Sequence, residues 1–340
     1  MMAGRYSFGG ASRVIENLAD NLGKKGVDIT IGALKFMRLP PTGAYDVSKI
    51  PLHNVSKLKK VLDDFDIVHN HHPITNYLAL ISQRAFVYHY HGAPDFGKGN
   101  LLRFNMLLSI RLMNYRFDAI IAVSESGATD LKRYLGLNAT HVIYNGVESH
   151  RFRPGLDEKF RKGTPQFLFV GNIYKHKNVK ELVQALKELL KEYPEAHLQI
   201  VGNGHNCRRL RAFISELELD EHVELVGRVP DYELPYYYTS CDVYVTASRW
   251  ELFGLPLLEA MACGKPIVAS SIRPHIELVA KSKSGDVYSQ GNIEDLCEKV
   301  IKTYENRGRY RSNALQFARK HDWSVAAERV LKIYAEILHN

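Results

Sequence analysis

Short apolar runs of strand length alternate with longer amphipathic segments along most of this chain. The longer segments repeat their apolar positions with a helical period, whereas the short runs do not. Strands and helices that alternate in this way are typical of parallel sheets covered by helices on both faces, so the pattern predicts an α/β protein. The predicted strands span residues 28–34, 66–70, 86–90, 119–123, 140–144, 166–170, 197–201, 223–226, 242–246, 266–269 and 286–289, and the clearest helices span 11–24, 179–192, 207–217, 293–306 and 323–338.

The alternation pauses once, at residues 149–165, where two prolines flank charged residues without a clear period. Such a stretch indicates a linker. A chain of 340 residues is long enough for two domains. We therefore expect one domain over residues 1–155, a second over 156–322, and a final helix within 323–340. The segment before the first glycine pair is polar, so the first strand is either short and irregular or lost because the sequence begins late.

Basic residues gather in the first half of the chain. Up to residue 153 there are 19 Lys and Arg against 12 Asp and Glu, whereas the remainder has 26 against 25. A basic surface suits anionic partners such as phosphates or acidic lipid headgroups. A soluble basic protein without such a partner explains the charge equally well. Nothing in the sequence indicates a nucleic-acid partner.

The four cysteines lie far apart and form no C-x-x-C pair, so buried free thiols are favoured over a disulfide framework or a zinc site. No apolar run approaches the roughly 20 residues that cross a bilayer, and the first residues are polar and glycine-rich. We therefore expect a cytoplasmic protein, with peripheral contact to the inner face of the membrane as an option.

The segment 248–265 (SRWELFGLPLLEAMACGK) carries the strongest chemical signal. It predicts a short helix over 257–263, entered through Phe253, Gly254 and Leu255, whose open backbone amides suit a diphosphate. Glu251 precedes this loop and Glu259 is expected on the first helical turn. A carboxylate beside phosphates is best used to accept bonds from hydroxyl groups, although a first-turn acid that only stabilises the helix dipole would explain Glu259 too.

The segment 251–259 resembles the E-x7-E motif of glycosyltransferase family 4, which comprises retaining enzymes of the GT-B fold. The resemblance extends over nearly the whole chain, through the glycine pair and first helix near residue 10, FDAIIAVSESGATDL, VIYNGVESHRFRP and GRVPDYEL. It implies two doubly wound Rossmann-like domains that face each other across a cleft. The first would bind the acceptor and the second the nucleotide sugar, and the last helix would pack back on the first.

Carried over by position, the resemblance implies that Glu251, Lys177 and His91 act in catalysis. Lys177 would stabilise the leaving diphosphate, Glu251 and His91 would orient the donor sugar, and Glu259 would hold the ribose. Where the family usually has an arginine beside the lysine, this chain has Asn172, which Arg249 could replace in part. The remaining expected donor-binding residues are Gly10, Asn172, Gly202, Gly204, Arg228, Val229, Phe253, Gly254 and Leu255. The turn from Gly202 to Gly204 is also explained by an ordinary strand-to-helix connection.

Histidines crowd the first domain at His69, His71, His72, His89 and His91. A metal site is disfavoured because no carboxylate completes a known ligand spacing, and the implied fold neutralises phosphates without an ion. We expect neither a metal nor another cofactor. His91 could equally be a buried, hydrogen-bonded core residue. The apolar stretch 100–117 contains interspersed arginines and is either a core helix or a surface for a membrane or lipid-linked acceptor.

The sequence therefore predicts a retaining hexosyltransferase that moves a sugar from a nucleotide diphosphate to a glycan, a glycolipid or a lipid-linked acceptor. A catalytically weak or silent nucleotide-sugar-binding protein of the same fold is the alternative, because of Asn172 and the unusual N-terminal segment. An epimerase would lack the E-x7-E arrangement, and a Rossmann dehydrogenase would need a G-x-G-x-x-G loop that neither glycine segment supplies.

Overall fold

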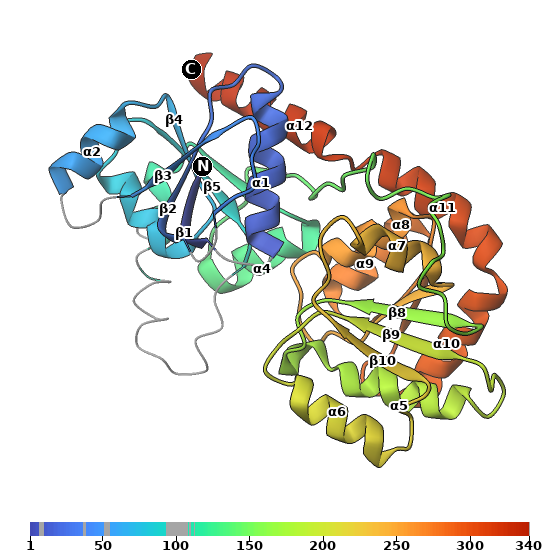
Figure 1. Cartoon of the computed structure of the whole chain (residues 1–340). Coiled ribbons are helices and arrows are strands. Elements are labelled where there is room, and N and C mark those ends of the chain that lie inside the picture. The colour runs from blue at the N-terminus through green and yellow to red at the C-terminus, as the bar shows by residue number, and fades with distance from the viewer. Residues whose placement is uncertain are drawn as a thin grey trace. The chain divides into compact units, whose positions relative to one another are not determined.

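The computed structural model describes residues 1–6, 10–36, 39–50, 55–92, 108, 110–111 and 113–339, with the side chains of 2–6, 34 and 74 left out. The chain forms two compact units, one of Met1–Gly146 with Trp323–Asn340 and the other of Val147–Asp322 (Figure 1). Residues 147–155, which the sequence assigns to the first domain, belong by their contacts to the second unit. Each unit is built around its own parallel sheet.

The first unit contains a seven-stranded sheet in the order β3-β2-β1-β4-β5-β6-β7, with every pair parallel. The order reverses between β1 and β4, and ligands of open α/β sheets bind beyond the carboxyl ends of the strands at such a point. The strands are β1 (Met2–Tyr6), β2 (Thr30–Phe36), β3 (Asp46–Lys49), β4 (Ile67–Asn70), β5 (Ala85–Tyr90), β6 (Ala119–Ala122) and β7 (His141–Val142).

Two of these strands were missed from the pattern of the sequence. β1 exists despite its polar composition, and it lies at the centre of the sheet, between β2 and β4. The Met1 amino group, just before β1, donates a hydrogen bond of 2.7 Å to the Thr30 carbonyl at the start of β2. β3 was missed because it lies at the edge of the sheet with all four residues exposed, so it has no apolar alternation to detect.

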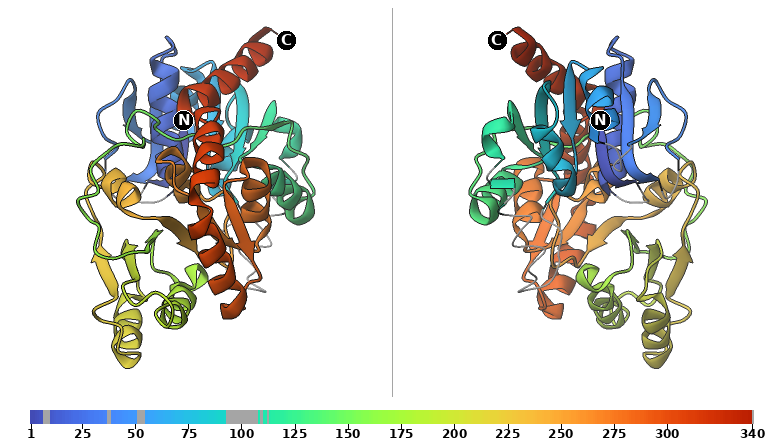
Figure 2. Two further views of the ribbon diagram at one scale, coloured as in Figure 1. Left: turned by 90° about the vertical axis from the view of Figure 1, so that its right-hand side faces the viewer. Right: turned by 90° about the vertical axis from the view of Figure 1, so that its left-hand side faces the viewer.

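The C-terminal helix α12 (Trp323–His339) belongs to the first unit and packs beside α1 (Gly10–Gly23) (Figure 1 and Figure 2). Its buried stripe follows the helical period through Trp323, Ala327, Val330 and Tyr334. The other helical segments of this unit are α2 (Val55–Asp63), η1 (Pro73–Leu80), η2 (Asn114–Arg116) and α4 (Glu125–Leu135).

The second unit contains a six-stranded parallel sheet in the order β10-β9-β8-β11-β12-β13. Here the order reverses between β8 and β11, so the loops that follow these two strands leave the same edge of the sheet side by side. The strands are β8 (Gln166–Val170), β9 (His197–Val201), β10 (Val223–Gly227), β11 (Val243–Thr246), β12 (Ile267–Ser270) and β13 (Gly285–Tyr288).

Helices cover both faces of this sheet, with α5 and α6 on one face and α7 and α8 on the other (Figure 1). α10 packs against α5, and α11 packs against α8 and α9. The helical segments are η3 (Lys175–Lys177), α5 (Val179–Leu189), α6 (Cys207–Glu216), α7 (Leu234–Ser240), α8 (Leu255–Ala262), α9 (Arg273–Ser282), α10 (Ile293–Glu305) and α11 (Arg307–Arg319).

Among the described residues, no helix combines the length and the apolar character that crossing a bilayer demands. The stretch 100–117, for which a membrane role was considered, lies for the most part outside the described residues.

Candidate active site

The reversal of strand order in the second unit brings Lys177 and Glu251 together. Lys177 ends the one-turn helix η3 after β8, and Glu251 lies in the loop after β11. The Lys177 ammonium donates to Glu251 Oε1 in a close ion pair, although 74 positions separate the two residues. Their side chains are only 16% and 18% exposed, so the pair is largely shielded from water.

The environment keeps Glu251 ionised. Burial alone would raise the pKa of this carboxyl, but the positive charge of Lys177 and hydrogen bonds from Lys177 and Ser248 outweigh it and hold the pKa below its usual value. The Ser248 hydroxyl lies 3.2 Å from Glu251 Oε1. Glu251 is therefore an acceptor at neutral pH, able to bind hydroxyl donors as well as an ammonium.

Backbone contacts fix the two loops against each other. The amide of Arg249 donates to the His176 carbonyl at 2.7 Å, which joins the segment before Glu251 to the turn that carries Lys177. The Ser270 hydroxyl, at the end of β12, donates to the Ser248 carbonyl at 2.5 Å. Three strand ends therefore contribute to one connected arrangement at the carboxyl edge of the sheet.

Helix α8 begins at Leu255, two residues earlier than the sequence predicts, with Pro256 at its second position. Gly254 immediately before it has φ 92° and ψ 63°, and a Cβ there would lie 2.8 Å from Leu257 Cδ1. Glycine is therefore required both by the backbone conformation and by the space. The Leu255 amide, at the first helical position, has no acceptor within the helix and contributes to an open start of the kind that binds anions.

The structure corrects the expected place of Glu259. It is the fifth residue of α8, beyond the first turn, so the alternative that it only balances the helix dipole loses its basis. Glu259 is buried and accepts a hydrogen bond of 2.7 Å from the Tyr238 hydroxyl of α7. This bond holds one carboxylate oxygen, Oε2, in place. The expected contact with a ribose stays a prediction.

The packing of neighbouring loops by itself explains the two glycines that follow β9. A Cβ on Gly202 would lie 2.0 Å from the Gly171 carbonyl oxygen, and one on Gly204 would lie 2.4 Å from that of Ile173. Both oxygens belong to the segment between β8 and Lys177. The two glycines thus let the loops after β8 and β9 touch, whatever ligand they hold.

The other expected donor-binding residues of this unit lie around the same edge of the sheet. Asn172 is partly buried between Gly171 and Ile173, and its carbonyl accepts from the Tyr174 amide at 2.9 Å. Arg228 is exposed and Val229 is partly buried, both directly after β10, whereas Phe253 is buried beside Gly254. Arg249, which could substitute for the missing arginine, is exposed.

Sequence reasoning missed His275, in the first turn of α9. The imidazole is fully buried, and a Cβ on Gly254 would lie 3.8 Å from its Nε2 atom. Burial lowers its pKa to about 4, against the attraction of Glu251, which raises it. A signal was present, because Pro274 marks a helix start directly after a predicted strand, where ligand-binding side chains gather.

In the first unit, Gly10 is the exposed first residue of α1 and His91 follows β5. His91 Nε2 lies 2.8 Å from His71 Nδ1, and His69 Nε2 lies 3.2 Å from His89 Nδ1. The ring planes within each hydrogen-bonded pair are nearly parallel, with interplanar angles of 16° and 12°. The pairs form two layers, in which His69 stacks on His71 and His89 on His91 with centroids 4.4 and 4.6 Å apart.

This stack bears on the question of a metal. Nitrogen atoms of His69, His71 and His89 lie within 4.8 Å of one another, as a metal site would require. An ion bound to imidazole lies close to the plane of each ring, however, and stacked layers do not share such a position. Burial lowers the pKa values of these three histidines well below normal, so the rings are neutral. The expectation of a metal-free protein stays a prediction.

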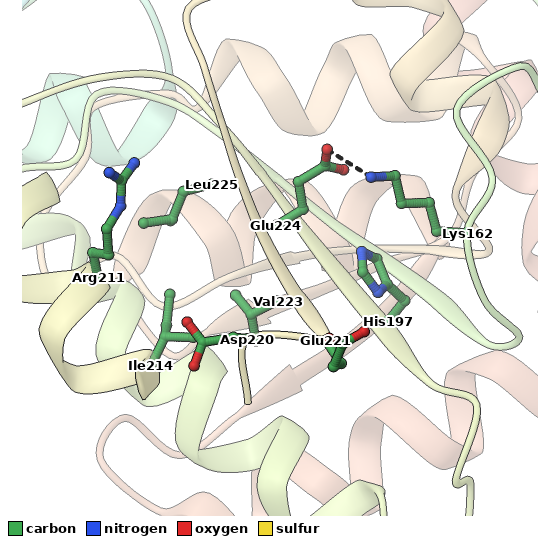
Figure 3. A pocket seen from close by; sticks show the side chains of 9 residues that line it. All are labelled: Lys162, His197, Arg211, Ile214, Asp220, Glu221, Val223, Glu224 and Leu225. Atoms are coloured by element: carbon green, nitrogen blue, oxygen red, sulfur yellow. Dashed lines mark hydrogen bonds and ion pairs between the residues drawn. The ribbon is translucent and has the colours of Figure 1, made fainter. Parts of the chain in front are cut away.

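A hollow of about 600 Å³ in the second unit lies elsewhere (Figure 3). Its lining includes His197 and Val223, which begin β9 and β10, and the ion pair between Lys162 and Glu224. These are the amino ends of the strands. The hollow is therefore at the opposite edge of the sheet from Lys177 and Glu251, and it does not form part of the candidate active site.

Comparison with known proteins matches both parts of the chain. Residues 156–321 match the family described as "Glycosyl transferases group 1", and residues 8–151 match "Glycosyltransferase Family 4". The two matches follow each other along the chain in the same order as its two sheets. The chain belongs to glycosyltransferase family 4. It is accordingly an enzyme that transfers sugars, as the sequence predicts.

Relatives of this glycosyltransferase cover most of its length. An uncharacterized glycosyltransferase of Methanocaldococcus jannaschii is 26% identical over 97% of this chain and 95% of its own. A phosphatidyl-myo-inositol mannosyltransferase of Propionibacterium freudenreichii is 28% identical over 82% of this chain and 72% of its own.

Solved structures show the same fold. Anabaena HepE, in complex with UDP and glucose, is 20% identical with a TM-score of 0.82 and covers 98% of both chains. Sucrose-phosphate synthase from Thermosynechococcus elongatus is 18% identical with a TM-score of 0.83 and covers 99% of this chain and 96% of its own. The predicted GT-B fold with two Rossmann-like domains is thereby confirmed.

Proposed function

We propose that this enzyme is a retaining hexosyltransferase that uses a nucleotide diphosphate sugar as donor. The observation that carries the proposal is the Lys177–Glu251 ion pair beside the open start of α8. An ammonium and the backbone amides of Gly254 and Leu255 at the helix start suit the charge of a leaving diphosphate, and the ionised carboxylate suits hydroxyl groups of a sugar. UDP and glucose in the HepE complex support a donor of this chemical class.

In the proposed reaction, the bond between the anomeric carbon and the diphosphate oxygen breaks while the acceptor oxygen bonds to the same face of that carbon. The acceptor proton passes to the departing phosphate oxygen, so no protein base is needed. Lys177 and the amides at Gly254 and Leu255 stabilise the diphosphate. Glu251 orients the sugar and Glu259 the ribose. No metal ion takes part in this scheme.

The remaining donor contacts are assigned by the family resemblance. They comprise side-chain or backbone contacts of Asn172, Gly202, Gly204, Arg228, Val229 and Phe253 in the second unit and of Gly10 and His91 in the first.

The acceptor is proposed to be a lipid-linked or glycan hydroxyl. The phosphatidyl-myo-inositol mannosyltransferase relatives support a lipid acceptor, as does the basic first half of the chain. We propose that the enzyme works in the cytoplasm at an anionic membrane surface. Sedimentation with phosphatidylglycerol vesicles but not with phosphatidylcholine vesicles, lost at high salt, would support this location. Equal sedimentation with both would contradict it.

The test of the donor site uses purified protein with UDP-glucose, GDP-mannose and ADP-glucose, and measures release of the nucleoside diphosphate. We expect one donor class to be turned over and its anomeric configuration to be kept in the product. Lys177→Ala and Glu251→Ala should each lower the rate about 100-fold or more. Lys187→Ala, on the exposed face of α5, is the matched control and should leave the rate unchanged.

Each outcome separates one alternative. Binding of a nucleotide sugar without any turnover would indicate a silent binding protein, and an altered free nucleotide sugar would indicate an epimerase. Wild-type rates in both the Lys177 and the Glu251 variants would show that the site has been assigned to the wrong residues.

A further inference from the structure

His275 is held in a single tautomer by its neighbours. Its Nδ1 atom lies 3.1 Å from the Ser270 carbonyl oxygen and 3.2 Å from the Ser270 hydroxyl. The carbonyl can only accept, and the hydroxyl proton is already donated to the Ser248 carbonyl. Nδ1 must therefore carry the ring proton, which leaves Nε2 as a bare lone pair.

That lone pair is buried and unused. Among the residues that the structure describes, His275 Nε2 has no hydrogen-bond partner, and the whole residue has 0% exposure. A buried nitrogen without a partner costs stability, so such an atom in a native protein calls for an explanation. Nε2 lies beside Gly254, at the loop where the diphosphate is proposed to bind.

The charges around His275 are those of the proposed active site. Glu251 attracts a proton to the ring and Lys177 repels it, while burial disfavours the imidazolium and lowers the pKa of His275 to about 4. In the free protein the ring is therefore neutral. The opposing charges of Glu251 and Lys177 decide whether the ring remains neutral.

Binding of a diphosphate changes this balance. The Lys177 ammonium is engaged with Glu251 in the free protein, and Asn172 in the same segment carries no charge. If Lys177 turns to the diphosphate, Glu251 loses its counter-ion in a site that is only 18% exposed. A buried carboxylate without a partner is strongly destabilising, which favours a replacement cation.

We propose that His275 takes up one proton at Nε2 when a nucleotide diphosphate sugar binds, and that it then replaces Lys177 as the counter-ion of Glu251. The proton comes from solvent, an N–H bond forms at Nε2, and no other bond changes. The inference rests on the proposed donor site. His275 is thus a positioning residue that keeps Glu251 ionised while Lys177 holds the phosphates.

The experiment is calorimetric titration with UDP-glucose, GDP-mannose and ADP-glucose, at about pH 6.5, in buffers that differ in ionisation enthalpy. These donors have no phosphate group that titrates near neutrality, so proton uptake reports on the protein. We expect roughly half a proton or more to be taken up per donor bound. Donor affinity should fall by up to about tenfold per pH unit above the pKa of the complex.

Two variants test the assignment. His275→Asn keeps an amide N–H for the Ser270 carbonyl but cannot titrate, and it should bind the donor without proton uptake. His222→Asn is the matched control, because His222 Nδ1 makes a similar 3.1 Å contact with the Ala196 carbonyl near the amino end of the sheet. This variant should retain the wild-type uptake.

A second measurement needs no variant. ¹⁵N chemical shifts of the His275 ring should show a neutral Nδ1–H tautomer in the free protein and an imidazolium in the complex. Donor binding without proton uptake, or proton uptake that persists in His275→Asn, would overturn the inference about His275. Either result would still support the proposed donor site, because the donor binds. If none of the three nucleotide sugars binds, the proposed function fails and the inference with it.

Discussion

Gly202→Ala offers a sharp test of how the loops of the second unit are assembled. Gly202 has φ 139°, a conformation that residues with a Cβ rarely adopt and that costs about 1–3 kcal/mol. The added Cβ would also lie 2.0 Å from the Gly171 carbonyl oxygen, where ordinary contact begins at 3.4 Å. Overlap of this kind typically costs a further 1–3 kcal/mol, so we expect a loss of about 2–6 kcal/mol.

The same substitution should impair catalysis. Relief of the overlap requires the loops after β8 and β9 to separate by about 1.4 Å, and the loop after β8 carries Lys177. A displacement of about 1 Å near the chemistry can cost on the order of 100-fold in rate. We therefore expect a corresponding fall in the release of nucleoside diphosphate from the donor.

Gly227→Ala is the matched control. Gly227 has φ 81°, so alanine is strained there too, but within the described part of the chain the added Cβ would have no atom within 4 Å apart from those of its two chain neighbours. This variant should lose only the stability that the strained backbone conformation costs, about 1–3 kcal/mol. Guanidinium unfolding of both variants, with rates measured on the folded protein, separates strain from overlap. Equal stabilities and equal rates would refute the argument.

Three further predictions concern other parts of the molecule. Tyr238→Phe removes the hydroxyl that donates to Glu259, so we expect stability to fall by about 1–3 kcal/mol and the KM for the donor to rise, as measured by unfolding and initial rates. Gly146→Ala places a Cβ 2.5 Å from the Trp323 amide nitrogen, and should loosen α12, detected as faster hydrogen exchange along that helix. Burial raises the pKa of Asp286, but hydrogen bonds from three neighbouring side chains outweigh it and lower the pKa below 3.8. The free energy by which Asp286 stabilises the fold is therefore present above pH 3.8 and is lost as the pH falls through the folded pKa. Asp286→Asn should accordingly flatten the acid limb of a plot of stability against pH, as measured by unfolding at several pH values.

Much of the fold could be predicted because the buried strands are apolar and follow one another at regular spacing. β8, β9 and β11 were predicted within a residue of their observed bounds. β1 escaped because its residues are mostly small or polar, and its central place depends on pairing with β2 and β4. Pairing between distant segments leaves no local signal in the sequence.

The candidate active site could also be predicted only in part from the sequence. Glu251, Gly254 and Glu259 were found because they share one short motif, and Lys177 because its segment resembles the family. The ion pair of Lys177 with Glu251 could not be foreseen, since it depends on the reversal of strand order between β8 and β11. His275 was missed for a related reason, because its meaning depends on the buried surroundings of Nε2 rather than on its neighbours in sequence.

The order of the two units along the chain affects how the protein folds while it is synthesised on the ribosome. The second unit is continuous, from residue 147 to residue 322, whereas the first unit is completed by α12, whose residues follow the whole second unit along the chain. Until Trp323 and the residues after it leave the ribosome, the face of α1 that packs on α12 stays exposed to solvent. Folding during synthesis therefore has to proceed out of order, with the later unit able to finish before the earlier one. A truncation that removes α12 should accordingly leave nascent chains dependent on chaperones.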